Sequence, residues 1–366
     1  MSKPDQPIAS LQVDAYTIPT DSPEADGTLR WSETTIVVVH ARSGRATGLG
    51  YTYADLATAR LIETKLAAVV CGLDALSPPG AWKEMVAAIR NLGRPGICSM
   101  AIAAVDVALW DLKARLLELP LCGLLGAVRD EVAIYGSGGF TTYDDEHLQR
   151  QLSAWVEEGI PRVKMKVGSE PERDPIRVRL ARAAIGDEAE LYVDANGAYS
   201  VPQALALAEA FAAQGGVSWF EEPVSSDDLA GLRAVRERSP RGMSIAAGEY
   251  GYDVPYFERM LAAGAVDVQQ ADVTRCAGIT ELLRVDALCL AHGRPLSLHC
   301  GPAIHVHPAA ALSQFVHLEY FHDHARIERM LFDGVPHPRG GALVPDASAP
   351  GMGLELKRRD AERLAA

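Results

Sequence analysis

Polar and ionisable side chains recur in this sequence at or just after the ends of short apolar runs. In chain order they are Lys164, Lys166, Asp194, Asn196, Glu221, Glu222, Glu249, Asp272, His299 and Glu319. One such residue by itself is usually an ordinary loop residue or a neighbour of a helix N-cap. Their recurrence after seven consecutive runs indicates that the fold gathers them at one place.

Asp194, Glu221 and Glu249 offer three carboxylates from three successive runs. Carboxylates that lie together repel one another unless a cation neutralises them. Oxygen ligands with no Cys or His among them favour Mg²⁺ over Zn²⁺. We therefore expect a magnesium site, and the alternative is a set of salt bridges to the many arginines.

Lys164 and Lys166 are two residues apart, so on a strand both side chains point to the same face. Two adjacent ammonium groups lower each other's pKa by repulsion. Because a neutral lysine amine is a competent general base, this pair is a candidate for proton abstraction. The alternative is an exposed edge strand.

His299 and Asp272 come from neighbouring runs, and the Asp272 carboxylate is expected to accept a hydrogen bond from the imidazole ring. Such a partner orients the ring and raises its basicity, which makes an acid/base dyad. The alternative is a structural histidine whose hydrogen bonds are satisfied locally. We expect the adjacent Cys300 to be a packed thiol.

The runs that carry these residues alternate with helical stretches rich in Ala, Leu and Arg. The eight strand candidates are residues 131–138, 161–168, 189–197, 216–223, 243–249, 265–273, 294–301 and 315–321. Alternating strands and helices predict parallel strands, and eight units predict a closed barrel with its active site at the carboxyl ends of the strands. An open doubly wound sheet is the alternative, but no strand is followed by a GxGxxG motif.

The first 126 residues have a different pattern. Residues 34–41 and 48–53 predict a β-hairpin, with a turn at Ser43 and Gly44. Residues 19–33 predict a polar loop of the length that is usually functional or disordered. Helices are expected from residue 54 to residue 126, most clearly over 99–120, where apolar residues recur at helical spacing.

Composition bounds the class of protein. The chain has 366 residues, of which 48% are hydrophobic and 23% charged, which is typical of a globular protein of one large domain or two. A net charge of −13 argues against a general nucleic-acid binder. No apolar run is long enough for a membrane span and no signal peptide is recognisable, so we expect a cytoplasmic protein without a membrane partner. The six scattered cysteines predict reduced thiols.

The ordered series of motifs resembles the enolase superfamily, and within it the mandelate racemase subgroup (mandelate racemase/muconate lactonizing enzyme-like). The segments that carry the resemblance are SMAIAAVDVALWDLKAR (99–115), KMK (164–166), VDANGAYS (193–200), FEEP (220–223), AGE (247–249), ADVTRCAGITE (271–281), SLHCG (297–301) and HLEY (317–320). It implies an α/β fold, a modified (β/α)7β TIM-type barrel with an α+β capping domain. The implied divisions are 1–127 for the N-terminal part of the cap, 128–330 for the barrel and 331–366 for a tail that returns to the cap.

The resemblance also implies a reaction. An essential Mg²⁺ would be bound by Asp194, Glu221 and Glu249, and Asn196 would contribute to substrate binding. The metal assists removal of the proton α to a carboxylate, through an enediolate intermediate. That proton is very weakly acidic, so the negative charge that forms must be stabilised by the cation and by hydrogen-bond donors.

Individual roles follow from the same resemblance. Lys166 would be the base on one face of the substrate, with Lys164 tuning it and helping to stabilise the enolate. His299, hydrogen-bonded to Asp272, would be the acid or base on the opposite face. Glu319 would be protonated and would donate a hydrogen bond to the substrate carboxylate. The 19–33 segment corresponds to the mobile loop that sets substrate specificity in this family.

Two reactions fit this set of groups. We favour dehydration of an acid sugar to a 2-keto-3-deoxy acid, because that reaction dominates the subgroup and the polar 19–33 segment suits a hydroxylated substrate. The alternative is a racemase or epimerase of a 2-hydroxy acid of the mandelate type. A small-molecule carboxylate substrate and a homo-oligomer, dimer or octamer, are implied in either case.

Two other classes of protein are less well supported. A zinc hydrolase barrel carries an HxH motif after its first strand, whereas here the HxH pairs are His305/His307 and His322/His324, both late in the chain. A non-catalytic binding barrel would exchange no α-proton of any carboxylate.

Overall fold

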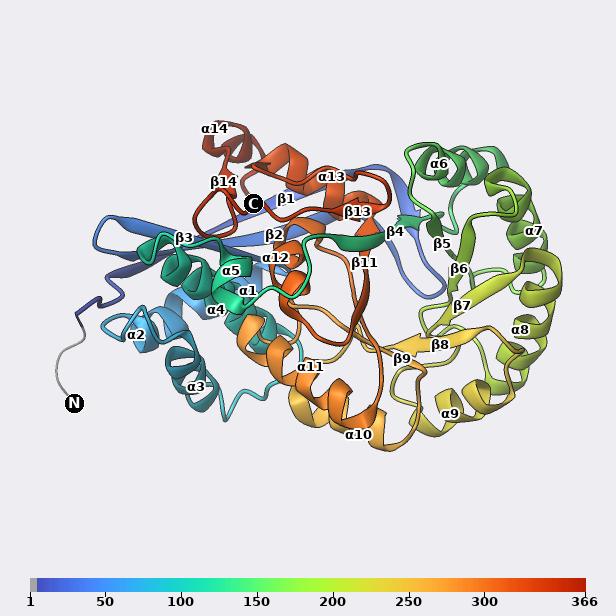
Figure 1. Ribbon diagram of the computed structural model, residues 1–366, viewed down its shortest axis with the longest axis horizontal. Coiled ribbons are helices and arrows are strands. Elements are labelled where there is room, and N and C mark those ends of the chain that lie inside the picture. Colours follow the sequence, from blue (N-terminus) through green and yellow to red (C-terminus); the bar gives the residue numbers. More distant parts are fainter. Residues whose placement is uncertain (1–4) are drawn as a thin grey trace.

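The computed structural model describes residues 5–366. Its first sheet is antiparallel and consists of β1 (Ser10–Ala25), β2 (Arg30–Ser43) and β3 (Ala46–Tyr53), drawn in blue in Figure 1. The predicted hairpin is confirmed, since β2 pairs with β3 from Ile36↔Tyr53 to Ser43↔Ala46. The helices that follow are α1 (Leu56–Leu61), the π-helix η1 (Ile62–Leu66), α2 (Ala67–Val70), α3 (Pro78–Ala88), α4 (Ile97–Leu116) and α5 (Leu121–Leu125).

Residues 19–33 are mostly strand, so the expectation of a loop was wrong for all but the connection at 26–29. β1 and β2 resume pairing at Glu24↔Trp31 after a register shift. The fully buried Glu24 carboxylate accepts a hydrogen bond of 2.7 Å from the Trp31 indole, which fixes the two strands together. We call residues 19–33 the flap. Figure 1 shows this hairpin reaching across to the barrel strands β5 and β6.

Helix α4 packs against this sheet with 15 of its 20 residues buried, as its apolar pattern predicts. β3 and α4 approach each other so closely that β3 needs glycine at two positions. A Cβ on Gly48 would lie 2.2 Å from the carbonyl oxygen of Ala108, and one on Gly50 would lie 2.3 Å from that of Ala104. The sheet and α4 therefore form one packed layer pair beside the barrel.

Eight parallel strands form the barrel, which closes by pairing of the last strand with the first. They are β4 (Val132–Gly138), β5 (Arg162–Lys166), β6 (Glu190–Asp194), β7 (Val217–Glu221), β8 (Ser244–Ala247), β9 (Val268–Ala271), β10 (Leu296–Leu298) and β11 (Phe315–Phe321). Each coincides with one of the predicted runs. The closed barrel is thus confirmed and the open sheet is excluded.

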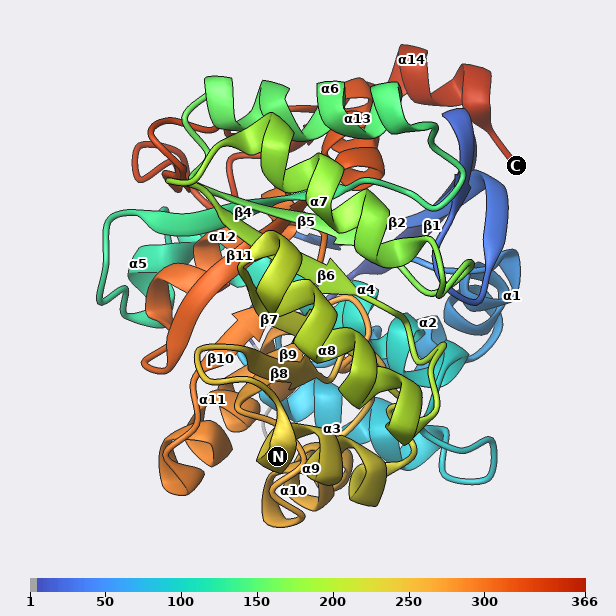
Figure 2. The same ribbon diagram turned by 90° about the vertical axis from the view of Figure 1, so that its right-hand side faces the viewer.

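Seven helices connect these strands and one more follows β11. They are α6 (Asp145–Glu157), α7 (Asp174–Ile185), α8 (Val201–Gly215), α9 (Leu229–Arg238), α10 (Val254–Ala262), α11 (Ile279–His292), α12 (Pro302–Ala311) and α13 (His322–Leu331). Figure 2 shows α6, α7 and α8 lying over the outer side of the strands. The apolar faces of these helices pack on the outward-facing strand residues, as in other barrels of this type.

The barrel interior has an aromatic lower layer beneath a polar upper layer. Tyr135, Tyr192 and Trp219 are buried together in one cluster. Because side chains alternate along a strand, the residue two positions later points the same way. Two residues after Tyr192 and Trp219 come Asp194 and Glu221, which therefore stand above the aromatic floor.

The C-terminal segment runs back to the first sheet. Its elements are β12 (Phe332–Asp333), β13 (Ala342–Leu343), β14 (Glu355–Leu356), α14 (Arg358–Ala361) and the 3-10 helix η2 (Glu362–Leu364). β13 adds antiparallel to β4, and the backbone N–H of Ala366 donates to the carbonyl of Ala15 in β1. The last residues of the chain thus lie against the N-terminal sheet.

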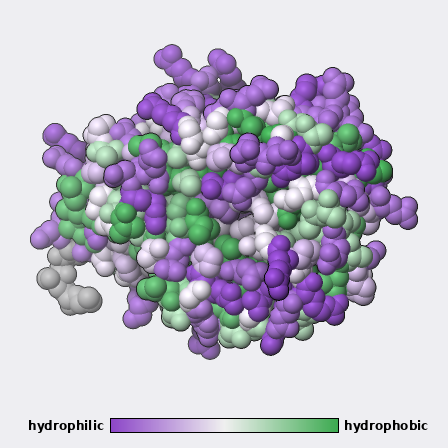
Figure 3. Space-filling view, turned by 45° about the vertical axis from the view of Figure 1, so that its right-hand side comes forward, coloured by the Kyte–Doolittle hydropathy of each residue, from purple (hydrophilic) through white to green (hydrophobic). Residues whose placement is uncertain are grey.

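Within residues 5–366, none of the helices has the length and apolar character needed to span a bilayer. In the face shown in Figure 3, hydrophilic side chains predominate and apolar ones form small separate patches.

Candidate active site at the mouth of the barrel

Three carboxylates converge where β6, β7 and β8 end. Asp194 and Glu221 are the last residues of their strands and are register partners, and Glu249 follows β8 by two residues. All three are buried, and oxygen atoms from each lie within 4.8 Å of one another. The sequence-predicted metal ligands are therefore brought together.

The electrostatics of this trio fit a divalent cation. Burial tends to raise the pKa of Asp194, but Lys166 and Lys164 outweigh it and hold the pKa at about 2. Burial, and then the charge of Asp194, raise the pKa of Glu221 to about 8. Glu249 Oε2 is buried and accepts no hydrogen bond, although His299 Nε2 lies 3.3 Å away. Hard oxygen donors with an unpartnered oxygen among them suit Mg²⁺, so these residues fit the expected ion.

Two lysines lie beside the carboxylates. Lys164 Nζ is 2.6 Å from Glu221 Oε1 and 2.9 Å from Glu319 Oε1, and it stands 5.4 Å above the ring of Tyr135. Lys166 Nζ is 2.5 Å from Asp194 Oδ2. Burial lowers the pKa of Lys166, and Lys164 lowers it further, as expected from the repulsion between the two ammonium groups. The facing carboxylates, chiefly Asp194, outweigh both effects and raise the pKa above its usual value.

The predicted acid/base dyad is present. His299 Nδ1 lies 2.9 Å from Asp272 Oδ2, and both side chains are buried. Asp272 is held by its other oxygen, which accepts hydrogen bonds of 2.7 Å from the backbone N–H and the hydroxyl of Thr274. The ring therefore turns Nε2 toward the carboxylates, 3.3 Å from Glu249 Oε2. Burial tends to lower the pKa of His299, but Glu249 and then Asp272 raise it above its usual value.

Glu319 reaches the same centre from β11. It accepts hydrogen bonds from the Ser137 hydroxyl at 2.5 Å and from the Cys300 backbone N–H at 3.2 Å. Burial tends to raise the pKa of Glu319, but Lys164 and then His299 outweigh it and hold the pKa well below the usual value. Both of its oxygens act as acceptors here.

Backbone strain is concentrated beside these groups. Asn196, Glu222 and Cys300 have φ of 46°, 38° and 51°, in the left-handed region that non-glycine residues seldom adopt. Each lies one or two residues after a side chain of the site. Such conformations persist only where the surroundings enforce them, and they cluster at functional sites. They turn the chain sharply after β6, β7 and β10.

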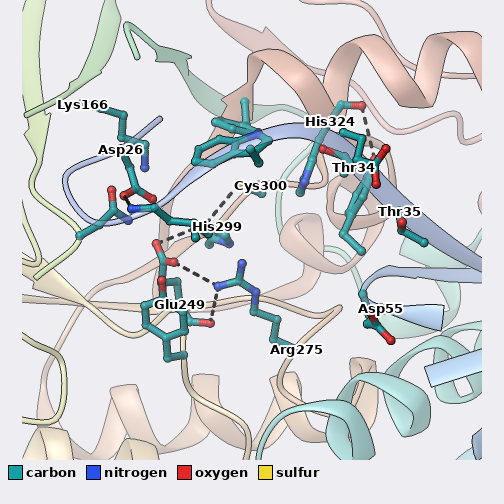
Figure 4. A pocket seen from close by; sticks show the side chains of 18 residues that line it. Asp26, Thr34, Thr35, Asp55, Lys166, Glu249, Arg275, His299, Cys300 and His324 are labelled. Carbon is teal, nitrogen blue, oxygen red and sulfur yellow. Dashed lines mark hydrogen bonds and ion pairs between the residues drawn. The ribbon is translucent and has the colours of Figure 1, made fainter. Parts of the chain in front are cut away.

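A cavity of 410 Å³ lies above this centre, and the dashed contacts of Figure 4 show how its charged side chains pair. Of the predicted residues, Lys166, Asn196, Glu249 and His299 line the cavity. The others lie behind them, in contact with these residues or with one another; they are Lys164, Asp194, Glu221, Asp272 and Glu319.

Trp31 lines the cavity from the flap, the segment expected to set substrate specificity. Other cavity residues were missed by reasoning from the sequence, among them Tyr53 of β3 and His324 of α13, which form a stacked pair with ring centroids 3.5 Å apart. Arg275 Nη1 lies 3.1 Å from Glu249 Oε1 and orients that carboxylate. The only signal in the sequence was the HxH pair that includes His324; nothing marked Tyr53 or Arg275 as lying near the barrel mouth.

The other HxH histidines bind backbone groups. His305 Nε2 accepts a hydrogen bond from the backbone N–H of Val273, and His307 Nδ1 accepts one from that of Cys122. Burial lowers the pKa of both. Each ring thus uses a nitrogen on a backbone N–H group, so the arrangement does not support a zinc hydrolase site.

Comparison with known proteins identifies the family. Residues 147–361 match the family described as enolase C-terminal domain-like, and residues 19–126 match the N-terminal domain of mandelate racemase / muconate lactonizing enzyme. The chain is 31% identical over 361 residues to 3,6-anhydro-alpha-L-galactonate cycloisomerase of Streptomyces coelicolor, covering 96% of this chain and 98% of that protein. It is 31% identical over 296 residues to L-talarate/galactarate dehydratase of Salmonella typhimurium, covering 79% and 74%.

Comparison with solved structures supports the same family. A mandelate racemase/muconate lactonizing enzyme-like protein from Rubrobacter xylanophilus superposes with a TM-score of 0.97 and is 58% identical, covering 98% of this chain and 100% of that one. A racemase from Streptomyces coelicolor, crystallised with bound magnesium, has a TM-score of 0.92 and 30% identity, with coverage of 98% and 100%. The chain therefore belongs to the mandelate racemase/muconate lactonizing enzyme family of the enolase superfamily, and it is a magnesium-dependent lyase or isomerase.

Proposed function

We propose that this enzyme dehydrates an acid sugar to a 2-keto-3-deoxy acid. The observation that carries the proposal is that Lys166 and His299 enter one cavity from β5 and from the end of β10, strands that are not adjacent in the barrel. A substrate held over Glu249 is thus flanked by two groups able to move protons. Relatives named arabinonate dehydratase and L-rhamnonate dehydratase, about 30% identical, support this reaction class.

Asp194, Glu221 and Glu249 would hold the magnesium ion. The bound cation supplies charge stabilisation for the carboxylate of the substrate as its α-proton leaves. A cation on these carboxylates would weaken the attraction of Asp194 for the Lys166 proton. The repulsion of Lys164 would then lower the pKa of Lys166, and its amine would be available as a base.

Lys166 Nζ takes the proton from C2, and the electron pair of that C–H bond passes into an enediolate. Lys164, behind the cavity wall, supplies positive charge that stabilises the enediolate, and Glu319 would donate a hydrogen bond to an enediolate oxygen only after gaining a proton. His299 Nε2, with the ring held by Asp272, gives a proton to the hydroxyl on C3, the C3–O bond breaks, and water leaves. The resulting enol takes a proton at C3 to become the 2-keto-3-deoxy acid.

The test is a screen of mono- and diacid sugars with the purified protein and Mg²⁺ in D₂O. Both 2-keto acid formation and loss of the α-proton NMR signal are followed. Keto acid from at least one sugar supports dehydration. Loss of the α-proton signal without keto acid refutes dehydration in favour of racemisation or epimerisation. Neither signal with any carboxylate refutes both reactions on acid sugars.

A further inference from the structure

The far part of the cavity carries acidic groups that lie outside the reaction centre. Glu33 of the flap and Asp55 at the start of α1 both line it, and neither is within an ion pair among residues 5–366. Figure 4 places Asp55 on the side away from Lys166, together with Thr34, the neighbour of Glu33 in the chain. Negative charge is therefore presented to the end of the substrate that does not react.

Lys166 and Arg275, the lysine and the arginine of the described cavity lining, are each already paired with a carboxylate. Lys166 is paired with Asp194, and Arg275 is paired with Glu249 while its guanidinium lies 5.2 Å from the centre of the Tyr250 ring. In Figure 4 Lys166 lies across the cavity from Asp55, and Arg275 lies between Asp55 and Glu249 with its guanidinium turned toward Glu249.

His324 adds a donor without adding charge. Its Nδ1 accepts a hydrogen bond from the backbone N–H of Gly301, so the ring proton is on Nε2. Burial lowers the pKa of His324 to about 3, and the ring is neutral at physiological pH. Nε2 is thus an uncharged donor in the cavity wall.

Asn196 is a second uncharged polar side chain of the cavity lining, like His324. Asn196 Oδ1 has no hydrogen-bond partner, although the side chain is only 9% exposed and lines the cavity. A buried polar atom without a partner is costly, so a ligand hydroxyl at this position is favoured. His324 and Asn196 thus offer a neutral donor and a neutral acceptor that match a chain of hydroxyl groups, and Asp26 is a further carboxylate of the cavity lining, on the Lys166 side.

We propose that the substrate is a sugar acid with one carboxylate and a neutral hydroxylated far end, an aldonate, and that Glu33 and Asp55 select against a second carboxylate. This inference rests on the proposed function. Glu33 and Asp55 are exposed, so a far carboxylate would be repelled by two hydrated like charges and would gain no cation in return. Rejection of the wrong ligand by an unpaired like charge is a common source of specificity.

The experiment compares pairs of sugar acids that differ only at C6, namely galactonate with galactarate and gluconate with glucarate. kcat/KM for 2-keto acid formation is measured with Mg²⁺ at low salt. Wild-type protein is expected to favour the aldonate of the reactive pair at least about tenfold, which corresponds to ~1.4 kcal/mol. Raising the salt to about 0.5 M is expected to reduce this preference, because exposed charges are then screened.

The variants Glu33→Gln and Asp55→Asn test the cause. Asn is as good an N-cap as Asp, so α1 keeps the hydrogen bond that Asp55 now accepts from the Ala57 N–H. The double variant is expected to reduce the preference for aldonate about tenfold through a gain on the diacid. Glu209→Gln, an exposed site on α8 outside the cavity lining, is the matched control and is expected to leave the preference unchanged.

A wild-type preference for the diacid, or a preference that the double variant leaves unchanged, would overturn the inference. Calorimetric binding of the same pairs to the Mg²⁺-loaded protein gives the ratio of affinities without turnover. If no pair yields keto acid or loses its α-proton, the proposed function fails, and the binding ratio still decides whether the two carboxylates select against diacids.

Discussion

Gly27 at the tip of the flap is the position where one methyl group is expected to disturb closure of the active site. A Cβ there would lie 2.4 Å from the carbonyl oxygen of Ala195 and 2.7 Å from that of Val167. Both atoms belong to the backbone at the barrel mouth and do not give way easily. Its φ is not in the left-handed region, so Gly27→Ala introduces a clash without strain in the turn itself.

The size of the effect follows from these distances. Ordinary contact needs more than about 3.4 Å, so the flap tip must rise by about 1 Å or the site must absorb the overlap. Overpacking of this kind costs about 1–3 kcal/mol, which reduces the closed population about fivefold to 150-fold. Trp31 and Asp26 form part of the cavity wall, so the variant is expected to raise KM by about tenfold.

Two measurements check this prediction. Steady-state kinetics with the acid sugar identified by screening gives KM and kcat. Limited proteolysis reports opening of the flap without substrate, and cleavage within residues 19–33 is expected to accelerate about tenfold.

Gly44→Ala is the matched control. Gly44 has φ of +56°, with nothing within 4 Å of an added Cβ, and it lies in the turn between β2 and β3. It is expected to lower the free energy of unfolding by about 1 kcal/mol and to leave KM and flap cleavage unchanged. If Gly27→Ala has the same KM and the same rate of flap cleavage as the wild-type protein, the flap tip does not dock on the barrel at this residue.

Three further predictions concern the site and its support. Asp272→Asn leaves His299 without its carboxylate and is expected to lower kcat about 10²–10⁴-fold; a loss below about fivefold contradicts the dyad. Mg²⁺ at about 100 times its Kd is expected to raise the free energy of unfolding by about 2.7 kcal/mol, and Glu249→Gln to reduce this gain; an undiminished thermal shift in the variant would place the ion elsewhere. Burial raises the pKa of Glu328 from 4.5 to about 8, so the unfolded chain releases this proton first and stability falls as pH rises through that interval. Glu328→Gln is expected to flatten the fall by roughly 1 kcal/mol per pH unit in urea unfolding, and equal slopes for both proteins would show that the carboxyl is ionised when folded.

Much of the barrel was predictable because its pattern is local. Each buried strand is a short apolar run, and each connecting helix has its own periodicity, so the eight strands could be found one by one. Parallel strands bring their carboxyl ends to one mouth, and that rule alone places Asp194, Glu221 and Glu249 together. Ligand type then points to Mg²⁺.

The flap was not predictable in the same way. Residues 19–33 contain Pro, Gly and several charges, which locally favour a loop. Pairing of β1 with β2 and burial of Glu24 against Trp31 override that tendency. These contacts form only in the tertiary structure, and they leave no periodic pattern of residues in the sequence from which they could be predicted.

The sequence by itself thus determined the barrel, the identity of its ionisable residues and the reaction class those residues support. The tertiary structure alone decided which of them face the cavity and which lie behind. It also decided the protonation of the groups, because Lys166 and Glu319 have pKa values set by partners from other strands. The spacing of residues in the sequence tells to which face of a strand each side chain points. The interaction between two charges depends on the distance between side chains of different strands, and that distance is set only in the folded protein.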